Sequence, residues 1–463
     1  MTSGPSTAIR TVRDAVRTQL WPLPTLAVTA AIALGLVLPR VDASVDAGLS
    51  GWADTVLFGG DAGSASTVLD AVASSLITVT SLTFSLTVVT LQLASSQFSP
   101  RLLRTFTQDL FVQSTLALFL ATFAYSLTVL RSVRSGDDGQ EPFVPRISVT
   151  TSYVLAMVSV IALVLFLAHL TRQIRVETML HQVRRDASGT LRSVLPPRGE
   201  GRPAVTVPTG VGQPLLATTS GFLLSVDADE LLDVSRATGS VVVLTAMPGD
   251  FVVEGTPVGS LHPDPAGPGD AATLSAEIPG TFPGTVPEEV RRAVGSALRT
   301  GTERTAAQDV GFGLRQLTDV TTKALSPGIN DPTTAVHALG HVSALLGELA
   351  DAELGPVESR GDDGSRVVLH RPDLEHLVEM SLTQIRRYGA ADPLVVARLY
   401  RLLAELSWRV SPADAWLVER ERGRLDHTVS GSDFDAVTLA GLTELSRRVT
   451  TAGPTPSSRS AHG

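Results

Sequence analysis

The stretch SLTFSLTVVTLQLASSQFSPR, residues 81–101, decides the fold class of this 463-residue chain. It has no charge before Arg101, yet hydroxyl and amide side chains recur throughout it. With its uncharged lead-in after Asp70, it exceeds the roughly 20 apolar residues that cross a bilayer. Backbone groups in hydrocarbon have to bond within their own segment, so the stretch predicts a membrane-spanning helix over residues 71–97.

Apolar residues are concentrated in the first 170 positions, where three further segments are long enough to cross a membrane. We predict a transmembrane domain over 21–170, following a cytoplasmic segment 1–20, with spans at about 22–39, 71–97, 110–130 and 147–170. The first span is short and follows arginines, a pattern that also fits a signal peptide, so its cleavage stays open.

Basic residues beside the spans predict the orientation, because cytoplasmic flanks are rich in Lys and Arg. They lie before the first span and after the second and fourth, at Arg10, Arg13, Arg17, Arg101, Arg104, Arg172, Arg175, Arg184 and Arg185. The loop after the first span is acidic instead. We therefore expect a multi-pass protein of the cytoplasmic membrane with both termini in the cytoplasm. Three arginines oppose this orientation, namely Arg131, Arg134 and Arg146.

The chain changes character after the fourth span. We expect a connecting helix and Pro/Gly-rich linker, a small β-rich module, a helical domain and a disordered tail, over 171–214, 215–285, 286–449 and 450–463. The predicted fold class is therefore a membrane α-helical domain of four transmembrane helices followed by a cytoplasmic α+β region.

The composition excludes several kinds of function. Residues 171–463 hold 28 of the 37 Lys and Arg residues and 36 of the 46 Asp and Glu residues, a net charge of −8 that argues against nucleic acid as a partner. The absence of cysteine excludes disulfides, thiolate metal sites and cysteine nucleophiles. Because no G-x-S-x-G, P-loop, Rossmann or H-E-x-x-H pattern is present, we expect no enzyme and no cofactor.

Polar side chains of the second span form two stripes when they are placed on a helix. One stripe comprises Ser74, Thr78, Ser81, Ser85, Gln92, Ser96 and Ser99, and the opposite one comprises Thr80, Thr83, Thr87 and Thr90. The first stripe could line a pore or cavity. Alternatively, small hydroxyl residues let helices pack closely and bond their own i−4 carbonyls. Packing explains most of this polarity, but Gln92 is a costly amide at that depth and favours a lining.

Two arginines follow the second span, in the segment SQFSPRLLRTF. Pro100 interrupts the helical hydrogen-bond ladder, and Arg101 and Arg104 then lie where anionic headgroups would be. Anchoring at the membrane surface is the simpler interpretation, and an anion-binding ring in an oligomer is the alternative.

The segment AMPGDFVVEGTPVGSL, residues 246–261, resembles the hairpin of a barrel-sandwich domain of the lipoyl and biotinyl type. Such a domain would carry its prosthetic group on a lysine. The chain has a single lysine, Lys323, far from this segment, so we expect a structural module or a docking surface.

The segment RTAAQDVGFGLRQLTDVTTKALSPGINDPTTA, residues 304–335, is the densest motif. Helical spacing predicts one shared polar face, made by Arg304, Gln308, Arg315, Asp319 and Thr322. Arg315 and Asp319 can pair at i,i+4. Gly311 and Gly313 would each weaken a helix by about 1 kcal/mol, which indicates close packing or a ligand near the backbone.

The end of this motif reads as a turn followed by a helix. Pro327 and Gly328 fit the centre of a type II turn, and Asp331 fits a helix N-cap followed by proline. Asn330 and Lys323 lack such reasons. The resulting candidate ligand or interaction site comprises Arg304, Gln308, Arg315, Asp319, Lys323, Asn330 and Asp331. A solvated helix face and a turn are the alternative.

Two histidines, His337 and His341, follow one turn apart on the next predicted helix. That spacing could hold a metal, but the sequence offers no third ligand beside them, so we expect no metal site.

Residues 81–109, 248–257 and 304–335 together resemble the bacterial membrane proteins grouped as domain of unknown function 2254 (DUF2254). The resemblance covers most of the chain. It implies an integral membrane protein with a cytoplasmic C-terminal region, and it carries no reaction, substrate or catalytic residues.

The sequence thus leaves two functional hypotheses of different classes. The first is a homo-oligomeric, channel-like or transporter-like membrane protein with a cytoplasmic regulatory domain. The second is a membrane-anchored sensor or scaffold, whose cytoplasmic domain binds a small ligand or a protein through Lys323, Asn330 and the face from Arg304 to Asp319.

Overall fold

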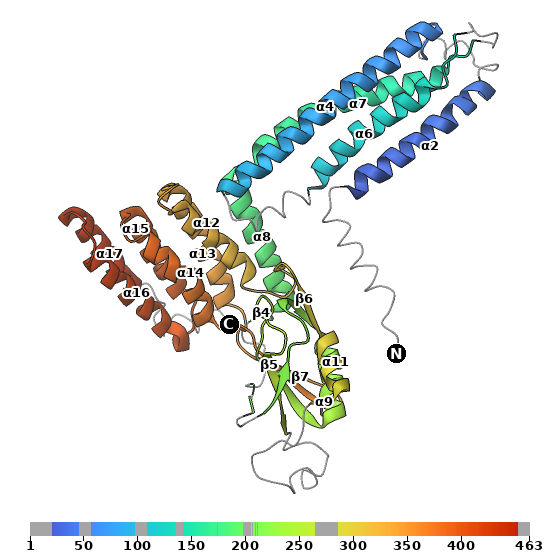
Figure 1. Cartoon of the computed structure of the whole chain (residues 1–463). Coiled ribbons are helices and arrows are strands. Elements are labelled where there is room, and N and C mark those ends of the chain that lie inside the picture. The colour runs from blue at the N-terminus through green and yellow to red at the C-terminus, as the bar shows by residue number, and fades with distance from the viewer. Residues whose placement is uncertain are drawn as a thin grey trace, which may run out of the picture. The chain divides into compact units, whose positions relative to one another are not determined.

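The computed structural model describes residues 21–45, 57–97, 109–135, 142–173, 175–197, 205–263 except 206, 209 and 211, and 286–451. The chain divides into two compact units, Met1–Thr178 and Met179–Gly463. Figure 1 shows long helices in the first unit, and strands and shorter helices in the second. The predicted N-terminal segment, Arg101 and Arg104, and nearly all of the predicted tail lie outside the described residues.

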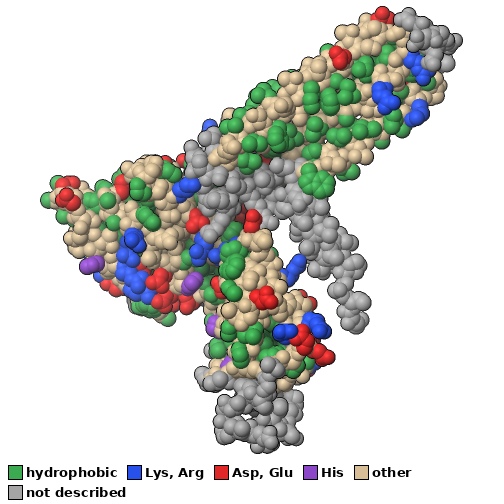
Figure 2. Space-filling model, in the orientation of Figure 1, with side chains coloured by type: hydrophobic (Ala, Val, Ile, Leu, Met, Phe, Trp, Pro, Cys, Tyr) green, Lys and Arg blue, Asp and Glu red, His purple; other side chains and the backbone are tan. Residues whose placement is uncertain are grey.

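The described part of the first unit consists of four long apolar helices. They are α2 (Pro22–Val45), α4 (Ala62–Gln97), α6 (Leu110–Leu130) and α7 (Arg146–Gln173). Each is long and apolar enough to cross a membrane, which confirms the four predicted spans. Hydrophobic side chains cover much of their visible outer surface (Figure 2).

Helix α4 begins earlier than the hydropathy alone indicates. The sequence predicts a start after Asp70, but the helix starts at Ala62. Asp61 explains this start, because its carboxylate accepts a hydrogen bond from the Ser64 backbone N–H at 3.0 Å, as an N-cap does.

Helix α6 lies at the centre of this unit, against α2, α4 and α7. Its Tyr125 and Phe119 are fully buried, as is Phe166 of α7. Together with Leu69 of α4, these side chains fill the space between the helices, so the interior of the bundle is a packed core.

The second unit begins with α8 and contains two sheets. Helix α8 (Val176–Val194) continues the chain shortly after α7. The five-stranded sheet has the order β1-β5-β3-β8-β7, with strands Gln213–Leu216, Pro257–Pro263, Ser240–Leu244, Arg366–Leu369 and Val357–Arg360. The three-stranded sheet has the order β4-β2-β6, with strands Phe251–Val252, Gly221–Val226 and Leu298–Gly301.

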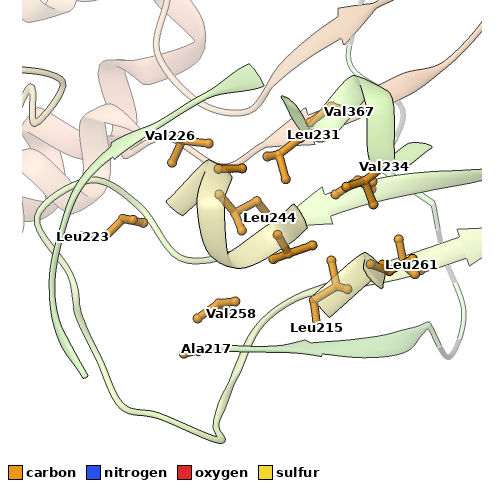
Figure 3. Packing of buried hydrophobic residues seen from close by; sticks show 14 of the residues in the cluster. Leu215, Ala217, Leu223, Val226, Leu231, Val234, Leu244, Val258, Leu261 and Val367 are labelled. Carbon is orange, nitrogen blue, oxygen red and sulfur yellow. The ribbon is translucent and has the colours of Figure 1, made fainter. Parts of the chain in front are cut away.

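The β-rich part extends beyond its predicted limits, because β6, β7 and β8 come from the segment predicted as helical. Strand β8 pairs in parallel with β3, through Val242 and Val367 among others, although the two strands are more than 100 residues apart. Helices α9 (Ala228–Thr238) and α11 (Glu288–Ala297) close the core. Figure 3 shows Val367 packed with residues of β1, β2, β3, β5 and α9.

The hairpin predicted within residues 246–261 is wrong. Strand β4 pairs with β2, whereas β5 pairs with β1 and β3, so the segment connects two sheets instead of folding back within one. Gly249 and Gly255 adopt positive φ angles of 99° and 77°, which other residues rarely do, and this explains the glycines of the motif.

The remaining helices form the helical part, and strands β7 and β8 lie between two of them in the sequence. It comprises α12 (Phe312–Ala324), α13 (Pro332–Ala350), α14 (Leu374–Tyr388), α15 (Pro393–Ser407), α16 (Ala415–Ser430) and α17 (Ala436–Thr451). Asp331, Asp373 and Asp392 each cap a helix N-terminus through their side chains. The segment predicted as helical over 286–449 is therefore mainly helical, apart from β6, β7 and β8.

Candidate functional site

The two polar stripes of α4 face different environments. Thr80, Thr83 and Thr90 are buried within the bundle. The opposite stripe is exposed at each position whose side chain is described: Ser74, Thr78, Ser81, Ser85 and Gln92. The side chain of Ser96 lies outside the described residues.

Threonine hydroxyls of both stripes bond carbonyls of their own helix. The hydroxyls of Thr80 and Thr90 bond the carbonyls four residues earlier, at 2.6 and 2.8 Å, and so cost little when buried. On the outer stripe, Thr78 does the same at 2.9 Å. Gln92 is exposed and is the last residue of the candidate span Ala62–Gln92. An amide that faced hydrocarbon there would lose its water partners.

A second polar feature, which the sequence analysis missed, joins α6 to α7. Ser126 and Ser152 share a hydrogen bond of 2.7 Å, and the Tyr125 hydroxyl donates to the Ser148 carbonyl at 3.1 Å. Hydroxyl side chains recur along both helices, and this pattern in the sequence could have indicated the contact. The hydroxyl groups bond to the neighbouring helix, so they hold α6 and α7 together.

Asp42, near the end of α2, belongs to the acidic stretch that follows the first predicted span. Its carboxylate is 4% exposed and accepts hydrogen bonds from the N–H groups of Ile147 and Ser148, at 2.8 and 3.0 Å. It also accepts from the Ser148 hydroxyl at 2.6 Å. Asp42 therefore caps the N-terminus of α7 from another helix.

An ionisable pair lies where α6 begins and α7 ends. Nε2 of His169 is 2.6 Å from Oδ2 of Asp109, and the other Asp109 oxygen accepts from the Phe111 N–H at 2.8 Å. Asp109 thus caps α6 and ties it to α7.

The predicted polar face of residues 304–322 is corrected by the structure. Helix α12 begins only at Phe312, so Arg304 and Gln308 lie in the preceding turns. Arg304 donates to Asp309 through Nε at 2.9 Å and through Nη2. Burial raises the pKa of the Asp309 carboxyl, and the Arg304 guanidinium and the Gly311 N–H act against that rise.

Arg304, Gln308 and Asp309 join the turn to the sheets. The Gln308 amide accepts from the Val226 N–H at 2.9 Å and donates to the Val226 carbonyl at 3.2 Å, as a neighbouring strand would. A side chain at Gly249 would collide with Arg304 and Asp309. Residues 248–257 and 304–335 therefore meet, and the polar residues at their contact have a structural role.

The loop between α12 and α13 confirms one prediction and corrects another. Asp331 caps α13, accepting from the Thr334 N–H at 3.0 Å. The predicted type II turn at Pro327-Gly328 is wrong, because it requires a positive φ at Gly328, which that glycine does not have. Asn330 has the positive φ, 49°, and Asn tolerates that conformation better than most residues. The backbone thus explains Asn330.

Arg315, Asp319 and Lys323 remain as the polar face of α12. They are spaced four residues apart and are all half-buried. Ligand binding at this face stays a prediction.

A third histidine lies beside the two that the sequence singled out. The rings of His181 in α8 and His341 in α13 have centroids 6.4 Å apart, with an angle of 66° between their planes. Within the described ranges, no three His, Asp or Glu side chains are arranged to hold a metal ion. No sequence signal linked His181 to His341, because they are 160 positions apart.

Comparison with known proteins adds a family but no activity. Residues 17–405 match the family model described as "Predicted membrane protein (DUF2254)". Uncharacterized proteins of Mycobacterium tuberculosis and Mycobacterium bovis are 36% identical to the chain over 403 residues, which is 86% of this chain and 73% of theirs. No solved structure matches the chain. The chain is therefore a membrane protein that belongs to the DUF2254 family.

Proposed function

We propose that the protein is a homo-oligomeric, channel-like protein of the cytoplasmic membrane, in which α4 lines a polar path between copies. Its path-lining residues are Ser74, Thr78, Ser81, Ser85 and Gln92, and the second unit is its cytoplasmic regulatory part. The observation that carries this proposal is the outward exposure of the whole described stripe.

The packing of the first unit supports a path between copies. Tyr125, Phe119 and Phe166 fill the interior of one bundle, which leaves polar transport to a surface that two or more copies share. Gln92 ends the candidate span, where its outward amide would cost several kcal/mol if it faced hydrocarbon and little if it faced water or another amide. Oligomerisation around this face removes that cost.

The chemistry of the stripe restricts what could pass. Hydroxyl and amide groups can replace part of the hydration shell of a small ion or bind a neutral polar solute. No charged side chain lies among its described members, so the path would select weakly between cations and anions.

The first prediction is a loss of solute flux when the stripe is made apolar. Liposomes with the wild-type protein should release a small ion or an uncharged polyol. The Gln92→Leu variant, which closes the polar face, should reduce that flux by about tenfold or more.

Ser114→Leu is the matched control, because Ser114 is an exposed hydroxyl residue on α6, outside the stripe. This variant should conduct as the wild type does. The proposal would be contradicted if the wild-type protein released none of the common ions and polyols, or if wild type and Gln92→Leu released them equally fast.

A further inference from the structure

Three histidines and two arginines meet where α8 packs on α13. His181, Arg184 and Arg185 come from α8, and His337 and His341 come from α13. These two helices lie far apart in the chain, so the cluster exists only while α8 is docked.

Helix α8 also packs closely against α12 and the turn that precedes it. A side chain at Gly313 of α12 would collide with Ala187 of α8, so the glycine gives α8 its room. Farther along α8, the Thr190 hydroxyl donates to the Ala306 carbonyl at 3.1 Å. A separation of the helices would therefore open a buried surface.

His181 also contacts a residue of its own helix. Nη2 of Arg185 lies 3.2 Å from Nε2 of His181 on the exposed side of α8. This contact lies within α8, so docking does not depend on it.

His341 faces positive groups as well. Arg184 and His181 act on it from α8, and His337 acts from its own helix. Arg184 is paired with Glu348 at 3.4 Å, and Asp331 acts on His337. Among the described residues of α12, α14 and α15, no charged group is found to act on His341.

Proton uptake therefore works against docking. Burial lowers the pKa of His341 below its ordinary value of 6.5, and the neighbouring positive groups lower it further. At His341 the docked state therefore binds fewer protons than the released state. Docking is consequently complete above the ordinary value and weakens as the pH falls through the lowered pKa. Asp186 of α8 has the opposite sign, because burial raises the pKa of its carboxyl from the ordinary value of 3.8, and Arg185 acts against that rise.

We propose that the contact between α8 and α13 is an acid-sensitive latch, in which protonation of His341, whose ring lies against His181 of α8, releases α8 from the helical part of the second unit. Helix α8 follows the last membrane span in the chain. The latch is independent of whether the membrane unit conducts anything.

Single cysteines can test the latch, because the native chain has none. Ser188→Cys places a thiol on the buried face of α8, and Ser193→Cys places a reference thiol on its exposed face. Maleimide reacts with the thiolate, so each labelling rate depends on pH through ionisation of the thiol. The ratio of the two rates in the full-length protein cancels the part of this dependence that both thiols share. From about pH 7.5 to about pH 5.5 we expect this ratio to rise about tenfold.

The rise should fall below about twofold in the His341→Gln variant, because the neutral amide cannot take up a proton. His427→Gln, an exposed histidine on α16, should leave the rise intact. Leu191→Cys, also buried on α8, is a second reporter that shows whether Ser188→Cys itself disturbs the packing.

Three results would overturn the latch. The ratio could stay constant with pH, or it could rise equally in the His341→Gln variant. Labelling of Ser381→Cys, which is buried in α14, could rise in parallel, and that would mean acid unfolding of the whole unit.

Discussion

Replacing Asp309 with alanine is expected to destabilise the second unit by about 3–5 kcal/mol, the cost of leaving a buried charge without its partner. Asp309 is 5% exposed and is held by the Arg304 guanidinium. Arginine stays charged at every accessible pH, so Arg304 cannot escape the loss by releasing a proton. Denaturant unfolding of the full chain in detergent measures the effect.

The reverse substitution should cost less, which makes the prediction specific. In Arg304→Leu the Asp309 carboxyl, whose pKa burial already raises, can take up a proton and become neutral. Its stability should therefore recover as the pH falls. Asp351→Ala removes a half-exposed pair with Arg409 and should change stability by about 1 kcal/mol at most. Equal costs for Asp309→Ala and Asp351→Ala would contradict this account.

The second large effect concerns Gly313, where α8 crosses α12. Alanine normally stabilises a helix by about 1 kcal/mol relative to glycine. At Gly313, however, the added methyl group would collide with Ala187, and overpacking of this kind costs about 1–3 kcal/mol. We therefore expect Gly313→Ala to lower the unfolding midpoint.

Gly340→Ala is the matched control, because the space beside Gly340 in α13 is open. It should raise the midpoint, so the two glycine-to-alanine changes should have opposite signs. Stabilisation by both would show that α8 does not pack closely on α12.

The sequence is most informative where the signal is local. Uncharged segments of sufficient length predict all four described spans, because a bilayer imposes length and polarity directly. Asp331 predicts the start of α13 for a similar reason, since its carboxylate bonds a backbone group only three residues away. The membrane class and most helices follow from signals of this kind.

Contacts between distant segments could not be read in this way. The parallel pairing of β3 with β8, and the capping of α7 by Asp42, depend on how helices and strands pack in three dimensions. The same is true of the outward direction of Ser81, Ser85 and Gln92, because a helical projection separates two stripes without showing which one faces the bundle. The sequence also could not show the positive φ of Asn330, which explains this residue without a ligand.

Cysteine cross-linking in membranes tests most directly whether the outward face of α4 is shared between copies. Ser81→Cys and Ser85→Cys, each introduced alone into the cysteine-free chain, should give covalent dimers with a short bis-maleimide. Val164→Cys, which is 62% exposed on α7, should not. Dimers from the α4 positions only are the predicted result. No dimers from either helix, or equal yields from both, would contradict a shared α4 face and with it the proposed polar path.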